Sequence, residues 1–233
     1  MIKSGPLPKH LQVTEMLIRE IAAGHIPDGS RLPPERKMAA ELNIAVGTLR
    51  KALAELESKQ MLERVQGSGN YVRARPAAES IYAFFRLELA DGGGLPTARV
   101  IQVSRQPKPE DAPAFGEGAI AHRIRRLRYL DDQPIAVEEI WLDGRFINRL
   151  DASQLVDSLY FFYKKTLGLV ITRVIDRVGV GPAPAWTPQA FPMPHGAPAG
   201  YIERLSWGQD DTPAEFSRTW FDPELARYTM RLQ

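Results

Sequence analysis

Side chains that can bond to nucleic acid gather in the stretch "NIAVGTLRKAL", residues 43–53. Arg50 presents a planar fork of donors that fits O6 and N7 of guanine, and Thr48 can meet a phosphate or a thymine methyl group. Lys51 adds a positive charge beside them. On a helix predicted for residues 46–60, all three lie outside the stripe that the leucines form. A face of this kind indicates contact with double-stranded DNA.

The elements that must position these side chains are short helices and a hairpin. The spacing of apolar residues predicts helices over residues 9–23 and 35–42, and Arg36 at the start of the second would bind a DNA phosphate. After the third helix, "LERVQGSGNYV" predicts a hairpin in which Gly67 and Gly69 would let the backbone approach a minor groove closely. Three helices followed by a hairpin are the plan of a winged helix-turn-helix.

A second group of charged residues belongs to the C-terminal part of the chain. In "RIRRLRYL", strand alternation sends Arg126 and Arg128 to the same face. The turn "DDQP" then folds the chain back and brings Glu138 near them on the neighbouring strand. Two guanidinium groups and a carboxylate among apolar neighbours predict a pocket for an anionic, hydroxylated or zwitterionic small molecule. The alternative is cross-strand pairing on a wet sheet face, which contributes little.

Composition limits the classes of function. The 233 residues include no cysteine, which excludes disulfides and thiolate nucleophiles, and the four histidines are scattered, so we expect no metal site, cofactor or catalytic residue. The first 75 residues hold 12 Lys and Arg against 8 Asp and Glu, a mild excess that suits a nucleic-acid module. The chain shows neither a secretory signal nor a membrane-length apolar run, so a cytoplasmic protein without a membrane partner is expected.

The C-terminal part also repeats itself. "DDQPIAVEEIWLD", residues 131–143, is echoed by "DDTPAEFSRTWFD", residues 210–222, and "ARVI" at 98–101 by "TRVI" at 172–175. We interpret this as a duplicated unit of strand, short helix and β-hairpin, fused into one antiparallel sheet.

The stretch "LPPERKMAAELNIAVGTLRKALAELESKQMLERVQGSGNYV" resembles the DNA-binding domain of GntR-family bacterial transcription regulators. "RLRYLDDQPIAVEEIWL", "DSLY" and "TPAEFSRTWF" resemble the ligand-sensing UTRA domain of the HutC subfamily. The resemblance implies an α+β fold: an N-terminal winged helix-turn-helix and a C-terminal chorismate-lyase-like domain with an antiparallel sheet and flanking helices. It also implies a homodimer on a roughly palindromic operator, and effector binding by Arg126, Arg128, Glu138, Ser158, Tyr160 and Glu215.

Three positions depart from the family pattern. Ala45 and Val46 stand where Ser-Arg is frequent, which removes a helix cap and a possible DNA contact. Phe221 replaces a tyrosine that could touch the ligand, and Ala83 or a neighbouring phenylalanine replaces a serine that helps to bind sugar phosphates. These departures change the expected operator and effector, and sugar phosphate is not a safe expectation for the latter.

The predicted domains are residues 1–75 for DNA binding, 76–80 for a linker, and 81–233 for effector binding and dimerisation. The function expected is a ligand-responsive regulator, in the role of a repressor that an effector releases from its operator. The alternatives are a constitutive or architectural DNA-binding protein without a ligand, and an enzyme of chorismate-lyase-like fold. The all-helical sensor of FadR-like regulators would need metal-binding histidines on long helices, a pattern that residues 80–233 lack.

Overall fold

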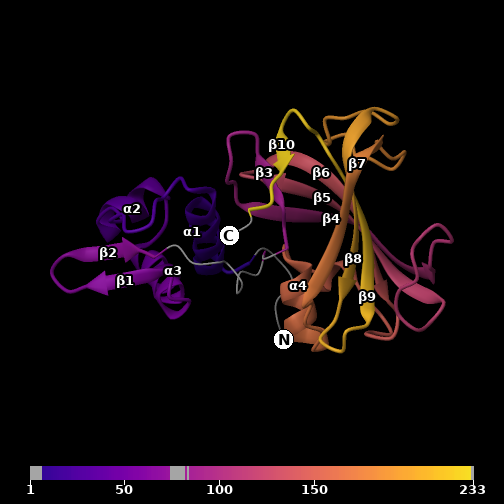
Figure 1. Cartoon of the computed structure of the whole chain (residues 1–233), viewed down its shortest axis with the longest axis horizontal. Helices are drawn as coiled ribbons and strands as arrows, with labels where there is room; N and C mark the ends of the chain where they lie inside the picture. The colour runs from indigo at the N-terminus through magenta and orange to yellow at the C-terminus, as the bar shows by residue number, and fades with distance from the viewer. Residues whose placement is uncertain (1–6, 74–81, 83, 232–233) are drawn as a thin grey trace. The chain divides into compact units, whose positions relative to one another are not determined.

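The computed structural model describes residues 7–73, 82 and 84–231 (Figure 1). Contacts divide these residues into two compact units, one of residues 7–95 with 229–231 and one of residues 96–228. The predicted linker, residues 76–80, lies outside the described part of the chain.

Three helices form most of the first unit, as the sequence predicts. They are α1 (Lys9–Ala23), α2 (Glu35–Glu41) and α3 (Val46–Ser58). Helix α1 ends at Gly24, which has a left-handed backbone (φ 82°), and Asn43 turns the chain between α2 and α3 with φ 49°. Short polar side chains and glycine adopt that conformation at low cost, so both positions end a helix without strain.

The core of this unit lies between α1 and α3. Leu17 and Ile18 of α1 meet the buried leucines Leu49, Leu53 and Leu56 of α3 in one apolar cluster. Burying a side chain of this size stabilises the fold by about 1.5–3 kcal/mol. The leucine stripe is therefore turned inward, which leaves the other face of α3 free for a partner.

A hairpin of β1 (Leu62–Val65) and β2 (Gly69–Val72) follows the helices and forms the predicted wing. Residues 29–32 run along the outer side of β2, where the Leu32 amide donates to the Asn70 carbonyl at 2.9 Å and the Gly29 amide to the Val72 carbonyl at 2.9 Å. Gly67 has φ 75°, which a residue with a side chain adopts only with strain. The wing is thus a small sheet with a glycine turn at its tip.

Residues 84–95 pack within the same unit and include β3 (Leu87–Leu89). The buried guanidinium of Arg19 donates to the carbonyl oxygens of Leu87 at 2.5 Å and Gly94 at 2.8 Å. The carboxylate of Glu20 lies against Gly93, where an added Cβ would be 2.1 Å from its Oε1. Residues 92–94 therefore form a turn against α1, and a neighbouring carboxylate makes this turn unsuitable for a phosphate.

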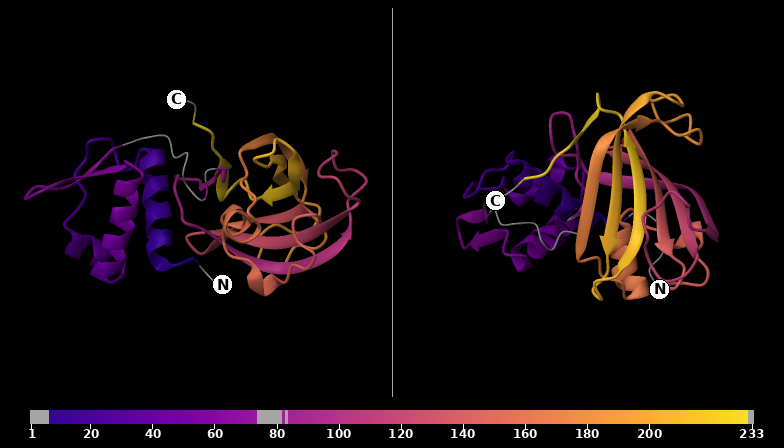
Figure 2. Two further views of the ribbon diagram at one scale, coloured as in Figure 1. Left: turned by 90° about the horizontal axis from the view of Figure 1, so that it is seen from below. Right: turned by 45° about the vertical axis from the view of Figure 1, so that its right-hand side comes forward.

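The second unit is built on one six-stranded antiparallel sheet in the order β4-β5-β6-β9-β8-β7 (Figure 2). Its strands are β4 (Pro96–Pro107), β5 (Ile120–Leu130), β6 (Gln133–Asp143), β7 (Arg173–Pro182), β8 (Pro198–Trp207) and β9 (Pro213–Phe221). The remaining elements are η1 (Ala152–Gln154), α4 (Leu159–Phe162), η2 (Tyr163–Leu167) and β10 (Ala226–Tyr228). The predicted α+β class, with a winged helix-turn-helix and an antiparallel sheet, is confirmed.

The strand order agrees with a duplicated unit. Strands β4, β5 and β6 form one meander, β7, β8 and β9 form another, and β6 pairs with β9 where the two meet. The prediction of a short helix inside each repeated unit is wrong, because residues 108–119 and 183–197 form turns and irregular chain. Prolines recur in both segments and lack the N–H that a helix interior needs. The helical elements α4 and η2 instead follow the first meander in the sequence and precede the second.

No helix among the described residues has the length and apolar character needed to cross a membrane.

Candidate functional site

Helix α3 presents the predicted DNA-contact residues to solvent. Arg50 is 65% exposed along its side chain, Lys51 is exposed, and Thr48 is half-buried at the same end of the helix. The Arg50 Nε donates to Glu35 Oε2 at 2.7 Å, so α2 supplies a carboxylate that holds the guanidinium. An exposed pair of this kind is weak and is exchanged readily for another partner. Arg50 is therefore positioned and still available to a base.

The other predicted DNA residues lie on α2 and the wing. Arg36 is exposed, and within the described chain no carboxylate lies within ion-pair distance of it. Gly67 is exposed at the wing tip, and a Cβ placed there would meet nothing within 4 Å. Gly69 differs, because its Cβ would lie 2.9 Å from the Nε of Arg31. The missing side chain at residue 69 therefore makes room for an arginine of this chain.

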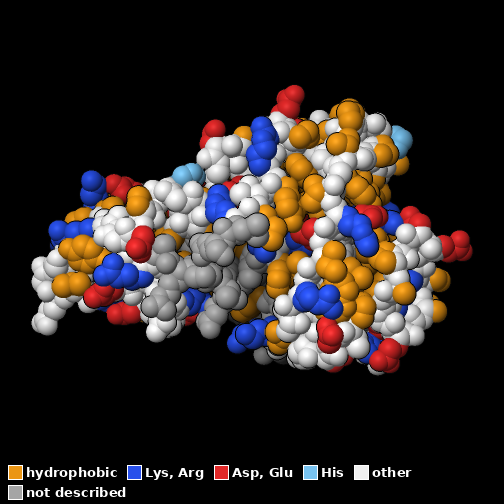
Figure 3. Space-filling model, in the orientation of Figure 1, with side chains coloured by type: hydrophobic (Ala, Val, Ile, Leu, Met, Phe, Trp, Pro, Cys, Tyr) orange, Lys and Arg blue, Asp and Glu red, His pale blue; other side chains and the backbone are white. Residues whose placement is uncertain are grey.

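Charges on this unit are mixed. On the face shown in Figure 3, Lys and Arg side chains of the winged unit alternate with Asp and Glu side chains and do not form one continuous basic patch. On this face, a DNA partner would therefore meet separate cations and no uniform positive field.

Arg126, Arg128 and Glu138 lie together on one face of the sheet. Arg126 and Glu138 are register partners on β5 and β6, with Arg126 Nη2 2.7 Å from Glu138 Oε2. Arg128 Nε lies 3.7 Å from Glu138 Oε1, and both arginines donate to the main-chain carbonyl of Asp157. All three side chains are buried. The structure brings these predicted residues together, and they bond to one another.

Glu215 anchors a second cluster on the same sheet face. Tyr163 donates to Glu215 Oε2 at 2.6 Å, and Tyr160 and Ser206 approach Oε1 at 3.1 and 3.2 Å. The tyrosines come from η2 and α4, so these helical turns lie over the sheet at this point. Ser158 caps α4, because its Oγ accepts a hydrogen bond from the Phe161 amide at 3.3 Å.

Arg204, on β8, is partly buried, with 15% of its side chain exposed, and lies near both clusters. Its Nε and Nη2 bond to the two carboxylate oxygens of Asp176 at 2.6 and 2.7 Å, and Tyr228 donates to the same carboxylate at 2.6 Å. The positive charge of Arg204 favours the ionised form of both Glu138 and Glu215, and burial outweighs this effect at Glu215. Arg204 is therefore a neighbour of both clusters.

Burial and ion pairing shift the two carboxyl groups of the site in opposite directions. Burial alone would raise the pKa of Glu138, but the adjacent charges of Arg126 and then Arg128 hold that pKa below its ordinary value. Burial raises the pKa of Glu215, and the hydroxyl groups that bond to it offset the increase only in part. Glu138 is therefore held as a carboxylate, whereas Glu215 takes up a proton more easily.

Phe221 fills the place of the absent family tyrosine. Its ring packs on Gly200, where an added Cβ would lie 2.2 Å from the ring. The ring thus occupies this end of the face with apolar surface. Among the described residues, no group of three or more His, Asp or Glu side chains could hold a metal ion.

Comparison with known proteins identifies the two parts. Residues 9–72 match the bacterial regulatory proteins of the gntR family, and residues 91–227 match the UTRA domain. The chain belongs to the GntR family. It is 52% identical, over 98% of each chain, to the HTH-type transcriptional regulator SmoD of Agrobacterium fabrum. It is also 26% identical to the HTH-type transcriptional repressor NagR of Bacillus subtilis, over 97% of this chain and 95% of NagR.

The fold of this GntR regulator has solved counterparts. The structure of YydK from Bacillus subtilis covers 97% of this chain and 100% of its own, with a TM-score of 0.56 and 21% identity. The ligand-binding domain of a GntR-family regulator from Bordetella bronchiseptica covers 64% of this chain and 96% of its own, with a TM-score of 0.55 and 22% identity. Both show the same fold. The matched families are those of transcription regulators, and the predicted family is confirmed.

Several residues that touch the predicted sites of this GntR regulator do not stand out in its sequence. They are Glu35, Asp157, Tyr163, Asp176, Arg204, Ser206 and Tyr228. Asp157 acts through its main-chain carbonyl, for which the sequence carries no signal. The alternation of charged and apolar residues in "YIERLSW" places Arg204 on a defined face, and only the pairing of β8 with β9 shows that this is the face of Glu215.

Proposed function

We propose that this GntR regulator is a homodimeric repressor of the HutC subfamily, which a small anionic or zwitterionic metabolite releases from its operator. The observation that carries the proposal is the presence in one chain of an exposed DNA-reading helix and a separate, buried polar cluster on the UTRA sheet. The relative NagR is a transcriptional repressor, and this supports the proposed direction of control. Action on DNA implies a cytoplasmic location.

DNA reading is assigned to α3 and the wing. A recognition helix enters the major groove with its first residues at the base edges, which gives this position to Thr48 and Arg50. Arg36 and Lys51 would bind phosphates, and the tip at Gly67 and Gly69 would approach the minor groove. Two copies of the unit would read half-sites about one helical turn apart.

The guanidinium groups of the sheet site support an anionic group on the effector. Arg126, Arg128 and Arg204 gather here with the carboxyl groups of Glu138, Asp176 and Glu215. Burial raises the pKa of Glu215, which disfavours the negative charge of that group. Guanidinium forks bind carboxylate or phosphate through paired hydrogen bonds, so an anion can bind where these side chains exchange partners. Ser158 and Tyr160 would add hydroxyl contacts.

Dimerisation is assigned to the second unit. Strand β7 is the last strand in the sheet order, and it carries the exposed apolar side chains Ile175, Val178 and Val180. Figure 3 shows apolar side chains gathered along this part of the sheet. Exposed edge strands with apolar side chains favour pairing with another chain. The proposed domain limits stay at residues 1–75 and 81–233.

Release requires coupling between the two sites. An effector changes operator affinity only if it binds the DNA-released arrangement of the dimer more tightly than the DNA-bound one. The sheet site suits this role because its polar side chains already bond to one another, so a ligand must replace some of these bonds.

The test measures operator release by a metabolite library on the full-length chain. The operator is first selected from a random duplex pool, and release is followed by fluorescence anisotropy. The wild-type chain should release the operator with at least one anionic or zwitterionic compound, whereas Arg128→Lys should bind the operator and ignore that compound. Arg149→Ala, an exposed arginine of the same unit, is the control and should respond like the wild type.

Two results would contradict the proposal. A wild-type chain that binds its operator equally with every compound would favour the constitutive DNA-binding alternative. An Arg128→Lys chain that releases at the wild-type effector concentration would exclude the sheet site.

A further inference from the structure

Arg31 is an exposed cation of the DNA-binding unit that the DNA-contact residues named above do not include. Within the described chain, no carboxylate lies within ion-pair distance of it. It directly precedes the buried Leu32, whose side chain belongs to the core of the unit. Because neighbouring side chains of extended backbone point to opposite sides, Leu32 in the core turns Arg31 outward.

The main chain fixes Arg31 against the wing. Residue 31 forms a bridge with Tyr71 of β2, and the next amide, that of Leu32, donates to the Asn70 carbonyl at 2.9 Å. The guanidinium lies directly over Gly69, where a Cβ would be 2.9 Å from Nε and 3.4 Å from Nη2. Glycine at residue 69 therefore provides the space in which this cation sits.

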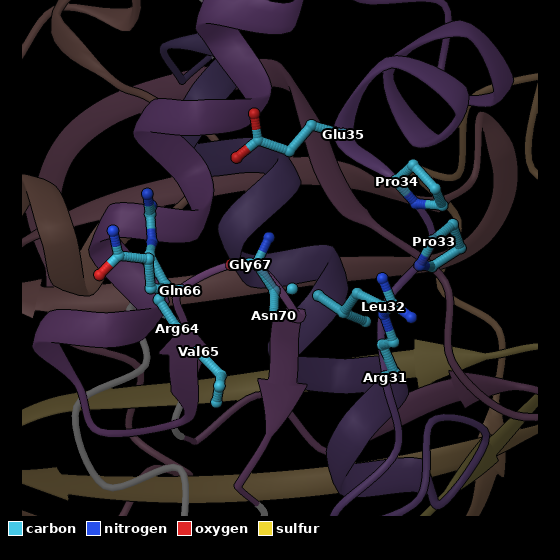
Figure 4. A pocket seen from close by; sticks show the side chains of 11 residues that line it. Arg31, Leu32, Pro33, Pro34, Glu35, Arg64, Val65, Gln66, Gly67 and Asn70 are labelled. Atoms are coloured by element: carbon cyan, nitrogen blue, oxygen red, sulfur yellow. The ribbon is translucent and has the colours of Figure 1, made fainter.

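Arg31 borders a pocket between the wing and the start of α2. The pocket has a volume of about 400 Å³ (Figure 4). Arg31 and Arg64 reach it from opposite sides, and Glu35 lies at its upper end in that view. The Glu35 carboxylate bonds to Arg50, and Arg64 lies 3.0 Å from Glu57 across an exposed pair. Of the charged residues that line the pocket, Glu35 and Arg64 each have an ion-pair partner. Arg31 has none among the described residues.

We propose that this pocket binds one phosphodiester group of a DNA strand, with Arg31 as its main ligand and Arg64 as the second. A singly charged phosphodiester matches one uncompensated guanidinium, and its oxygens suit the donor fork. The site adjoins the wing glycines and, through Glu35, the recognition arginine Arg50. A strand running between recognition helix and wing tip would pass over it. This inference rests on the proposed binding of DNA.

The first experiment compares exposed arginines of the wing in the full-length chain. Affinity for the selected operator and for a random duplex is measured by anisotropy as a function of salt. Arg31→Ala should weaken both complexes about tenfold near 0.1 M salt, and should lower the slope of log K against log salt by about 0.9, the value for one lost phosphate contact. Arg73→Ala is the control: Arg73 is an exposed wing arginine paired with Glu63 and does not line the pocket. It should change affinity less than twofold.

A second variant removes the space that the Arg31 guanidinium occupies and keeps the charge of Arg31. Gly69→Ala places a methyl group on the guanidinium of Arg31, and it should reproduce most of the Arg31→Ala loss. Combining the two changes should add little, because both act on the same contact. Circular dichroism melting shows whether the unit stays folded, since Gly69 has φ 132° and alanine strains the backbone there. Arg31→Ala, at an exposed position, keeps the test independent of that strain.

A third experiment identifies the source of the phosphate. Operators carrying a single neutral methylphosphonate are scanned linkage by linkage. One linkage should weaken wild-type binding about tenfold and leave the Arg31→Ala complex unchanged, which places that phosphate on Arg31. Inorganic phosphate, titrated against the Arg31 Nε–H resonance, should cause no shift at low millimolar concentration.

The outcomes separate this inference from the proposed function. If the wild type binds its operator and Arg31→Ala matches Arg73→Ala in affinity and salt slope, the pocket is not a phosphate site, and DNA binding stands. If inorganic phosphate binds at Arg31 and no methylphosphonate position depends on that residue, the pocket serves free phosphate and the inference fails. A wild-type chain that prefers no duplex overturns both.

Discussion

The two candidate sites of this regulator are built in opposite ways. The cationic side chains proposed to contact DNA are exposed, and where they have a partner, as Arg50 has Glu35, the pair is open to water. The charged side chains proposed to bind the effector are buried and bond to their neighbours, as Arg126 does to Glu138. An exposed cation can exchange its partner at little cost, whereas a buried charge that loses its partner destabilises the fold. We therefore expect function and stability to separate in the first region and to be coupled in the second.

The largest effect expected is on stability at the sheet. Arg126→Ala leaves the buried Glu138 without its nearest cation and should lower the free energy of unfolding by about 3–5 kcal/mol. Adding Glu138→Gln should recover part of this loss, because the buried carboxylate is gone. Urea denaturation measures both. A loss in unfolding free energy below about 0.5 kcal/mol is the range of ordinary surface substitutions. Such a result would show that the Arg126–Glu138 pair stabilises the fold no more than the exposed pairs of the winged unit.

Arg50→Ala is the corresponding test in the first region. If Arg50 makes the proposed bidentate base contact, this change should weaken operator binding by about 1–3 kcal/mol and relax the preference at one base pair. The urea midpoint should stay within about 0.5 kcal/mol of the wild type, since the Arg50–Glu35 pair is exposed. An unchanged binding titration would mean that α3 does not face the base edges.

Arg36→Ala separates positioning from reading within the same unit. A phosphate contact carries no sequence information, so affinity for operator and random duplex should fall by the same factor, and the salt slope should fall by about 0.9. Competition titrations with both duplexes at several salt concentrations give the two numbers. A loss confined to the operator would assign Arg36 to base reading.

The smallest effect concerns the pH dependence of the sheet site. Because burial raises the pKa of Glu215 in the folded chain, its stabilising contribution is complete below the unfolded carboxyl pKa and is lost as pH rises through the folded value. Glu138 has a lowered pKa, so its contribution is present above the unfolded pKa and is lost as pH falls.

Thermal melts of Glu215→Gln and Glu138→Gln across pH 3–8 test this opposition. The difference from the wild type should shift in favour of Glu215→Gln as pH rises and against Glu138→Gln over the same change. If the stability difference from the wild type changes in the same direction with pH for both variants, burial determines the pKa of both carboxyl groups.

The sequence predicts the three helices and the wing of the first unit, but not that residues 84–95 pack with them. Helical spacing and the glycine hairpin are local signals, and the helices and the hairpin form where these signals predict them. The last helix ends at Ser58, before the predicted residue 60, because Gln60 has a left-handed backbone (φ 58°) that an L-residue adopts only under local constraint.

The sheet site is predicted only in part. Strand alternation places Arg126 and Arg128 opposite Glu138, since one hairpin contains all three. Arg204 and Asp176 join them through the pairing of β6 with β9 and of β9 with β8, which depends on the whole sheet order and not on neighbouring residues. In the same way, the contact between Arg31 and Gly69 depends on residues 29–32 lying along β2, which the hairpin sequence alone does not show.

The bonds of Arg19 have a practical consequence for dissecting the molecule. Its guanidinium donates to the carbonyl oxygens of Leu87 and Gly94. The UTRA match begins between these two residues, at residue 91. A truncation after residue 75 removes these acceptors and leaves a buried cation on the helix that backs the recognition helix. A fragment that contains the DNA-binding unit should therefore extend to residue 95, because the contacts place the boundary of the unit there.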